Sequence, residues 1–209
     1  MREATRAVQS DYANYSAHLF LANSYAVLND PRVSTLRFET PWANELFLAN
    51  LLSPLGGSSL SRSISQQEYS RLFDRDYMGL FSLTDYASSG DWSESGSVYG
   101  KSGPVGYAVD TYYLNQNGQQ PNNEQKLFQT WVTMQGEISP QDSILAQVIY
   151  KDAEGGDLNL YYDPEKEASR TLHTEDLQQP IVLAGYRHQW SPEHQTLFLF
   201  ARLDNTATV

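Results

Sequence analysis

Cysteine is absent from the 209-residue sequence. Its absence excludes a thiol nucleophile, a zinc site with cysteine ligands and a framework of disulfide bonds. A cysteine-free chain also fits an oxidising compartment of a cell envelope. The argument for such a location has to come from other features.

Long apolar runs are missing as well. No stretch of about 20 consecutive apolar residues is present, so no transmembrane helix is expected. The mean hydropathy of −0.51 does not exclude strands that cross a membrane, because such strands show only every second residue to lipid.

Basic residues are few, since 14 Lys and Arg stand against 25 Asp and Glu and give a formal net charge of −11. Such a chain has no basic surface to neutralise a phosphate backbone. We therefore expect no nucleic acid among its partners.

A signal peptide is not visible at the N-terminus. Residues 1–10 contain two arginines, but no apolar stretch with a small-residue cleavage site follows them. If the protein belongs to the cell envelope, we expect this chain to be part of a longer precursor.

The first 74 residues show helical periodicity. Apolar residues recur every three or four positions over 11–28, where Ser10 or Asp11 can cap the helix and Pro31 follows its end. A second helix is predicted over 41–52, starting at Pro41, and a third within 63–74, where Ser65 and Glu68 have capping-box spacing.

Beyond residue 74 the period changes to two. In 105–113, Val105, Val109 and Tyr113 fall on one face while Gly106 and Asp110 fall on the other. Further strands are predicted at 76–87, 91–100, 126–138, 143–152, 180–190 and 195–204. Each is near the ~9–11 residues that a tilted strand needs to cross a bilayer.

The connections between these strands alternate in length. The segments 101–104, 139–142 and 191–194 are tight turns, whereas 115–125 and 153–179 are long and polar. Outer-membrane barrels have short periplasmic turns and long external loops. The sequence therefore predicts a mainly β fold, an antiparallel meander of about seven strands forming a partial transmembrane β-barrel, with an N-terminal α-helical segment.

Several segments resemble a known group of proteins. "HLFLANSYAVLNDP" is similar to a helix of a tetratricopeptide-type repeat, and "ETPWANELFLANLLSPLGG", "SISQQEYSRLFDRD", "GDLNLYYDP" and "HQWSPEHQTLFLFARL" resemble large bacterial envelope proteins in which such repeats precede an outer-membrane barrel. The resemblance implies a helical region over 1–74 in the periplasm and barrel hairpins over 75–209. Outer-membrane lipid is then the expected partner, and export of polysaccharide or another polar polymer follows by analogy of fold.

Two departures from that group concern the barrel. Seven strands is an odd number, whereas single-chain bacterial barrels have even numbers. The chain also ends at "DNTATV" and not in an aromatic strand. We therefore expect the barrel segment to be incomplete.

Candidate sites were weighed against plainer interpretations. The acidic side chains in 152–167 could bind calcium, although their spacing is not that of the twelve-residue calcium loop and a solvated external loop accounts for them. His188 and His194 flank a turn and lack further ligands. No serine lies in the strained G-x-S-x-G turn that holds a catalytic serine. Glu137 could form a glycosidase-type carboxylate pair with Asp142 or Glu193, but these residues lie in turns and not on the walls of a cleft. The acidic side chains are Asp152, Glu154, Asp157, Asp163, Glu165 and Glu167.

No catalytic, cofactor-binding or metal-binding residue is therefore assigned, and no enzymatic activity is expected. The Gly pairs at 56–57 and 155–156 lack the Lys-Ser or Lys-Thr of a phosphate loop. Whether the acidic loop 153–179 binds a metal ion stays open at this point.

Aromatic side chains are common near the predicted strand ends. Interfacial girdles of a membrane barrel would explain them, and so would the ordinary preference of aromatic residues for strands. The residues concerned are Trp92, Trp131, Trp190, Tyr77, Tyr86, Tyr99, Tyr112, Tyr113, Tyr150 and Tyr186.

Two other functions remain open beside a transport or export segment in the outer membrane. One is a soluble secreted β-sandwich that binds carbohydrate, and the other is a truncated reading frame with no independent function. In the membrane interpretation, Arg202 should turn toward water, so the face with Leu197, Leu199 and Leu203 is assigned to lipid.

Overall fold

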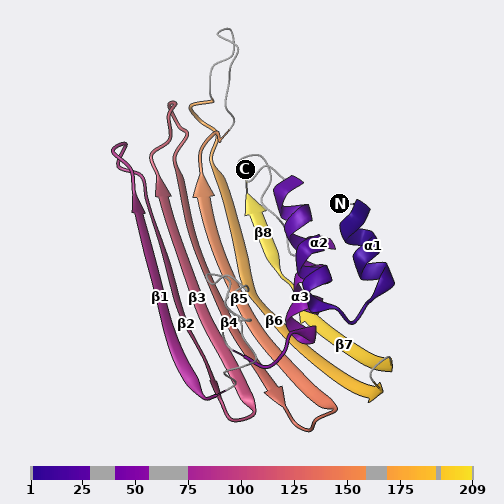
Figure 1. The fold of residues 1–209 in the computed structure, drawn as a ribbon. Helices are drawn as coiled ribbons and strands as arrows, with labels where there is room; N and C mark the ends of the chain where they lie inside the picture. The colour runs from indigo at the N-terminus through magenta and orange to yellow at the C-terminus, as the bar shows by residue number, and fades with distance from the viewer. Residues whose placement is uncertain (1, 29–40, 57–74, 159–168, 192–193, 209) are drawn as a thin grey trace.

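The computed structural model describes residues 2–28, 41–56, 75–158, 169–191 and 194–208. Within these ranges, helices come first and strands follow (Figure 1). The helices are α1 (Arg2–Ser10), α2 (Tyr15–Leu28) and α3 (Pro41–Leu52), and the strands are β1 (Tyr77–Tyr86), β2 (Trp92–Ser102), β3 (Val105–Gln116), β4 (Gln125–Glu137), β5 (Asp142–Gly155), β6 (Thr174–Ser191), β7 (His194–Arg202) and β8 (Asn205–Thr208).

The helix predicted over 11–28 begins later than expected. Asn14 precedes α2, and its side-chain oxygen accepts a hydrogen bond from the Ala17 amide at 3.2 Å, which is the contact of an N-cap residue. Asp11 instead accepts from Ala13 within the linker, and the preceding residues form the separate helix α1. The prediction over 41–52 is confirmed by α3, and the one within 63–74 lies outside the described residues.

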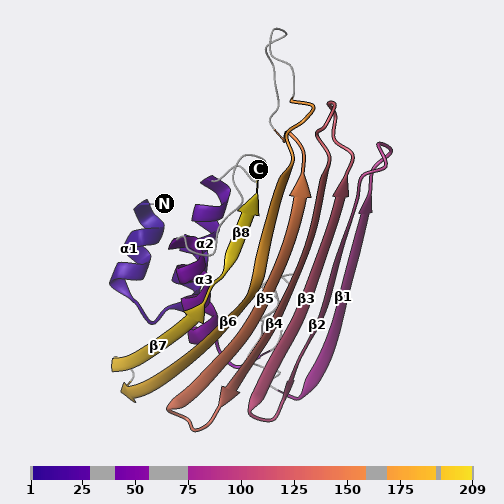
Figure 2. The same cartoon turned by 180° about the vertical axis from the view of Figure 1, so that it is seen from behind.

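The predicted antiparallel meander is confirmed. Strands β1 to β7 follow one another in a single sheet, each antiparallel to the next, as Figures 1 and 2 show from the two sides. Among the described residues β1 and β7 lie at the two edges, so the sheet is not closed.

The C-terminal strands differ from the prediction in two details. Strand β6 begins at Thr174 and not near residue 180, and the short strand β8 pairs with the start of β6. A register shift between Ile149 and Lys151 of β5 separates this added region from the rest of the β5–β6 pairing. The predicted 153–179 loop is therefore strand at its two ends, over 153–155 and 174–179.

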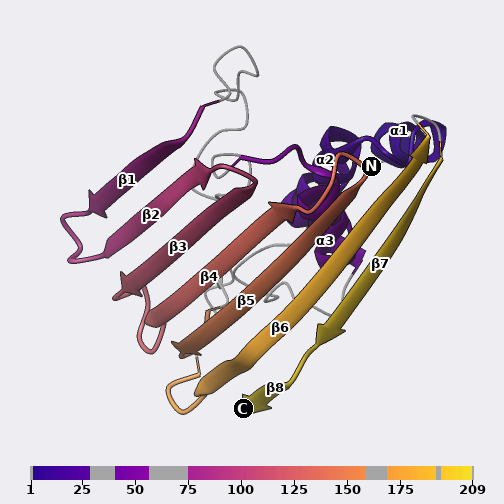
Figure 3. The same ribbon diagram turned by 90° about the horizontal axis from the view of Figure 1, so that it is seen from below.

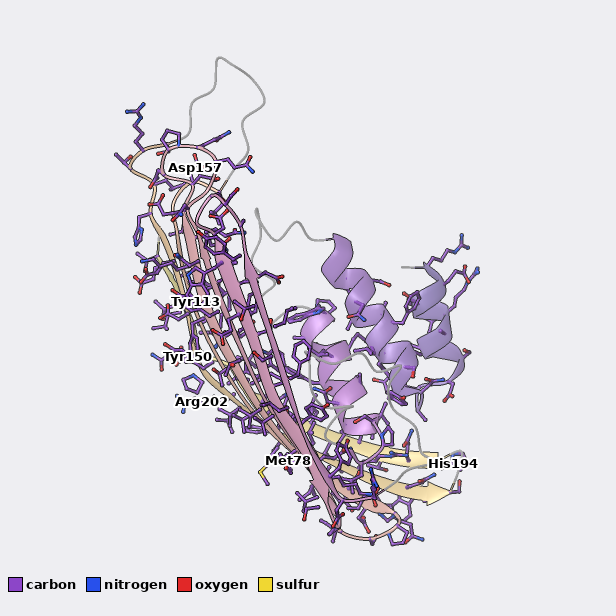
Figure 4. The ribbon with its side chains drawn as sticks, turned by 60° about the vertical axis from the view of Figure 1, so that its left-hand side comes forward. Met78, Tyr113, Tyr150, Asp157, His194 and Arg202 are labelled. Atoms are coloured by element: carbon purple, nitrogen blue, oxygen red, sulfur yellow. The ribbon has the colours of Figure 1, made fainter. Side chains whose placement is uncertain are left out.

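The sheet has two faces that we name by what lies on them. The helix face carries α1 to α3, which Figure 3 shows together on one side of the sheet. The open face is the opposite side, where Figure 4 shows Met78, Tyr113, Tyr150 and Arg202 pointing away from the helices.

The hydrophobic core lies between α3 and the helix face of β4, β5 and β6. Full burial of one large apolar side chain contributes about 1.5–3 kcal/mol, so this core is a main source of stability. This core contains residues of both helices and strands, so it joins the two regions that the sequence prediction divides near residue 74. Its buried members are Ala22, Trp42, Ala43, Leu46, Phe47, Leu51, Trp131, Leu145, Ile149, Ile181 and Leu183.

A polar contact joins α2 to α3. The buried ring of His18 places Nδ1 at 2.5 Å from Glu45 Oε2 and Nε2 at 3.0 Å from the Tyr12 carbonyl oxygen. Both partners accept hydrogen bonds, so the ring is held at its two nitrogens. The contact fixes α2 on α3, which in turn packs on the sheet.

The assignment of the β7 leucine face to lipid is wrong. Leu197, Leu199 and Leu203 pack against the core on the helix face. Arg202 lies on the open face beside Phe198 and Phe200, both of which are largely exposed. Apolar side chains on two sides of one strand made the sequence ambiguous, and packing against α3 decided which side is covered.

Candidate functional site: the two faces of the sheet

The open face carries a continuous surface that is apolar at its centre and has one charged residue, at its edge. Strand pairing brings every second residue of β1 to β7 into cross-strand rows, because side chains alternate between the two faces. Four consecutive rows, from the loop end toward the turn end, are Ser82, Gly96, Thr111, Thr130, Tyr150; Leu80, Val98, Val109, Val132, Val148, Val182, Arg202; Met78, Gly100, Tyr107, Met134, Ala146, Ala184, Phe200; and Ser102, Val105, Gly136, Ile144, Tyr186, Phe198.

We call these four rows the apolar band. Arg202, on edge strand β7, is the one charged residue in them. Many of the band's large side chains are exposed although they are apolar, for example Leu80 and Phe200. Contiguous exposed apolar surface of this kind marks an interface with a protein, a ligand or a membrane.

Charged and aromatic residues border the band at the loop end. Glu94, Tyr113, Phe128 and Asp152 are successive partners in the next row. Aromatic pairs cross the strands there, with ring centroids of Trp92 and Tyr113 at 4.8 Å and of Phe128 and Tyr150 at 6.1 Å. The side chains thus change from apolar through hydroxyl-bearing to charged over two rows toward the loop end.

The helix face has a different composition. Its three central rows are Tyr77, Lys101, Gly106, Gln135, Leu145, Gly185, Leu199; Gly79, Tyr99, Ala108, Thr133, Gln147, Leu183, Ala201; and Phe81, Ser97, Asp110, Trp131, Ile149, Ile181. Polar residues are concentrated on β2 to β4 and apolar ones on β5 to β7. Several of the polar ones are buried, among them Ser97, Asp110 and Thr133.

Charged residues on the helix face are paired or partly desolvated. Lys151 Nζ lies 2.6 Å from Asp176 Oδ2, and both side chains are largely buried. Burial lowers the pKa of the Arg187 guanidinium, against the opposing attraction of Glu137, and its Nε donates to Gln195 at 2.9 Å. Such groups suit a polar interior better than contact with lipid.

A hydrogen-bonded cluster lies at the turn end of the open face. Asp142 accepts hydrogen bonds from the hydroxyls of Ser139 and Tyr186, both at 2.5 Å, and its Oδ1 lies 2.7 Å from His188 Nδ1. The bonds from Ser139, Tyr186 and His188, in that order, hold the pKa of Asp142 far below its ordinary value of 3.8.

This cluster does not have the geometry of a catalytic triad. A triad needs the histidine to accept the serine proton, whereas here the Ser139 hydroxyl and the His188 ring both bond to the carboxylate. The cluster joins the β4–β5 turn to β6, which is a structural role. His188 thus pairs with Asp142, and His194 lies opposite Ser191 across the hairpin.

The carboxylates that the sequence suggested as a catalytic pair do not lie together in the structure. Glu137 closes β4 on the helix face and Asp142 opens β5 on the open face, so the two lie on opposite sides of the sheet. Glu193 is outside the described residues. A glycosidase-type pair of Glu137 and Asp142 is therefore not formed.

The long loops are linked by hydrogen bonds at the far end of the sheet. Asn122, which has a positive φ of 58°, donates through Nδ2 to the Ser169 and Leu172 carbonyls at 2.7 Å. Buried Asp157 accepts the Ser169 amide at 2.9 Å, and its own carbonyl accepts from Asn123. Asp157, singled out as a possible calcium ligand, thus connects two loops.

A calcium site finds no support in the described part of the loop. Across the described ranges, no group of three or more His, Asp or Glu side chains is placed to hold a metal ion. Asp152 and Glu154 lie on the open face of β5, apart from Asp157. Asp163, Glu165 and Glu167 lie outside the described residues.

The aromatic residues divide between the two faces. Trp131 is 3% exposed within the core. Tyr77, Tyr99 and Tyr112 also belong to the helix face, so these four do not form a surface girdle. The open face holds Trp92, Tyr86, Tyr113, Tyr150, Tyr186 and Trp190.

Within the described residues, no helix is both long and apolar enough to span a membrane. No protein-family description matches the chain, and comparison with curated proteins and with solved structures found no match either. The functional argument therefore depends on the sheet itself.

Proposed function

We propose that the sheet forms part of the wall of an outer-membrane β-barrel, with its open face against lipid and its helix face toward a polar interior. The apolar band is the observation that carries this proposal. Four rows, two of them across all seven strands, hold a single charged residue at one edge, as expected of a surface that contacts acyl chains. No chemical step is part of the proposal.

The apolar stretch of β4, which extends beyond the apolar band at both ends, suits a bilayer in length. Exposed apolar side chains recur from Phe128, in the bordering row, to Ile138, the residue after β4. Ten residues of strand rise about 33 Å, which a tilt of about 40° reduces to about 25 Å along the membrane normal. That height equals the apolar band of known outer-membrane barrels.

The helix face is polar over β2 to β4. Its residues there include hydroxyl, amide and carboxylate groups, such as Ser97, Gln135 and Asp110, all three of which are buried. Groups of this kind suit a polar solute or a hydrogen-bonding polymer such as a polysaccharide. Transport or export of such a molecule is the function that we propose.

The connections suggest the orientation. Tight turns join β2 to β3 and β4 to β5 at one end, and the longer connections lie at the other end (Figure 1). By the rule for outer-membrane barrels, the tight turns face the periplasm and the long loops face outward. Lipid cannot satisfy unpaired strand edges, so the proposal requires further strands at the edges of β1 and β7.

The test places an arginine in the centre of the band. Val132→Arg should destabilise the protein in lipid by about 2–4 kcal/mol, because the charge there has no water around it. Thr84→Arg is the matched control, since Thr84 lies on the same face but beyond the band, opposite Glu94. Urea unfolding after refolding into phosphatidylcholine vesicles measures both.

The soluble interpretation predicts the opposite result. In water, an exposed valine replaced by arginine changes stability by about 0.5 kcal/mol or less. A chain that is monodisperse without detergent and tolerates Val132→Arg as well as Thr84→Arg would contradict the membrane proposal. The exposed aromatic residues of the open face would then favour the carbohydrate-binding alternative.

A further inference from the structure

A six-residue segment, formed by the end of α3 and the residues that follow it, crosses the helix face of the sheet. Residues 51–56, which we call the strap, include the end of α3 and the segment that follows it. The strap is buried, with Leu51 at 0%, Ser53 at 3% and Leu55 at 7% exposure. It is therefore packed along its length.

The strap lies over one cross-strand row. Gly106, Gln135, Leu145 and Gly185 are successive partners on β3, β4, β5 and β6. Four neighbouring strands span about 14 Å at a strand spacing of about 4.8 Å. The strap thus runs across the strands and not along them.

Three contacts place the strap on this row. Leu51 lies over Gly185, where an added Cβ would be 3.0 Å from Leu51 Cδ1. Buried Gln135 donates through Nε2 to the Ser53 carbonyl at 2.7 Å. Over Gly106, an added Cβ would be 3.2 Å from the Gly56 amide nitrogen.

These four residues therefore form a surface that fits the strap closely, which we call the seat. Glycine occupies both ends of the seat, at the two places where the strap approaches the sheet most closely. At Gly106 the nearest atom is backbone, which cannot move aside as a flexible side chain can. The amide of Gln135 satisfies the carbonyl of Ser53, a buried residue of the strap.

We infer that the strap is the constriction of the proposed passage. The inference rests on the proposed function, because only in a barrel wall does the helix face line an interior. A segment fixed across four neighbouring strands occupies space through which a polar solute would pass. Its seat, and above all Gly106 and Gln135, then sets how open the passage is.

The experiment uses the absence of cysteine in the chain. Leu55→Cys provides a single buried thiol, and its rate of reaction with a maleimide reports release of the strap. Gly106→Val should displace the strap, because the new side chain would meet the Gly56 backbone. Gln135→Leu is a second, milder variant that removes only the hydrogen bond to Ser53.

Gly136→Val is the matched control. Gly136 is the neighbour of Gln135 on the open face, and an added Cβ there has only ordinary contacts, the nearest at 3.4 Å to Ile144. Each variant is made in the complete barrel, with the further strands that the proposal requires at the edges of β1 and β7, and its insertion into phosphatidylcholine vesicles is measured first, by resistance to external protease. Thiol labelling and osmotic swelling in raffinose, a neutral trisaccharide, are then compared.

We expect Gly106→Val to raise both the labelling rate and the swelling rate by about tenfold, which corresponds to a docking weaker by about 1.4 kcal/mol. Gln135→Leu should raise both by less, and Gly136→Val should change neither. Failure of every variant, and of the unmodified chain, to insert would overturn the proposed function. Normal insertion with faster labelling but unchanged swelling would overturn the constriction alone, and so would unchanged labelling.

Discussion

Val148 and Ile149 are neighbours in β5, yet they lie in opposite environments. Ile149 is 0% exposed in the core under α3, whereas Val148 is 41% exposed in the apolar band. Both residues are β-branched and apolar, so residue type alone does not tell them apart. The difference teaches that this sheet is apolar on two sides over β5 and β6, and that only one of those sides has a protein cover.

A second comparison divides the helix face. Over β5 to β7 it presents Leu145, Ile149 and Leu199, and α3 packs there. Over β2 and β3 it presents Ser97 and Asp110, which lie outside that hydrophobic core. The helices thus cover the apolar half of this face, as the hydrophobic effect requires. The open face is apolar over β1 to β7, and within the described residues no helix lies on it.

The largest effect on stability is expected from a substitution in the core, on the helix face of β5. Ile149→Ala should lower the free energy of unfolding by about 2–5 kcal/mol, because it removes buried methyl groups and leaves a cavity. Val148→Ala should cost under about 1 kcal/mol, because its surroundings are fluid lipid or detergent that can fill the space. Urea unfolding in detergent micelles, followed by the fluorescence of the four tryptophans, measures both.

Equal losses at the two positions would contradict this comparison. They would mean that the open face is packed as tightly as the helix face, as in the interior of a soluble sandwich. The proposal of a lipid-facing band would then fail together with the prediction.

Much of the fold could be predicted because its signals are local. The alternation in 105–113 placed Val109 and Asp110 on opposite faces, and the pairing of β3 agrees. Tight turns and polar loops marked the ends of the strands. These patterns depend on neighbouring residues, so sequence alone was enough to predict a seven-strand meander.

The features that escaped prediction depend on distant contacts. The helix face of β7 was misassigned because Leu199 contacts a core built largely from α3, which lies over 140 residues earlier. Tryptophan is a residue type typical of membrane interfaces, but Trp131 is buried because it packs within the same core. The strap has no motif, since Gly106 and Gly185 gain meaning only when strand pairing aligns them with Gln135.

A smaller effect is expected at Arg202, the charged residue of the apolar band. Its guanidinium lies 4.0 Å from Asp204, and both side chains are well exposed. If the open face of β7 contacts lipid at this position, Arg202→Leu should raise stability in vesicles by up to about 2 kcal/mol, since charge on a lipid face is unfavourable. Lys126→Leu, on the same face beyond the band, should gain under about 1 kcal/mol.

The sign of the Arg202 effect sharpens the comparison of the two faces. A gain in vesicles but not in aqueous buffer would place the open face of β7 at Arg202 against lipid. No gain in vesicles would instead place this position in water. Guanidinium unfolding of the same variant in both media provides the measurement.

The smallest effect is expected at the turn end of the open face, where Asp142 has a lowered pKa. Bonds from Ser139, Tyr186 and His188 favour the charged carboxylate in the folded state. A group with a depressed folded pKa contributes stability above its unfolded value, here 3.8, and that contribution is lost as the pH falls toward the folded pKa. Asp142→Asn should therefore lower the urea midpoint of unfolding at pH values above 3.8, and the difference from the unmodified chain should shrink at lower pH. Tyr186→Phe removes one donor and so raises the folded pKa of Asp142, so in that variant the contribution above pH 3.8 should be smaller and its loss should be complete at a higher pH. A difference between Asp142→Asn and the unmodified chain that does not change with pH would show that the cluster stabilises the turn by hydrogen bonds alone, without preference for the charged carboxylate.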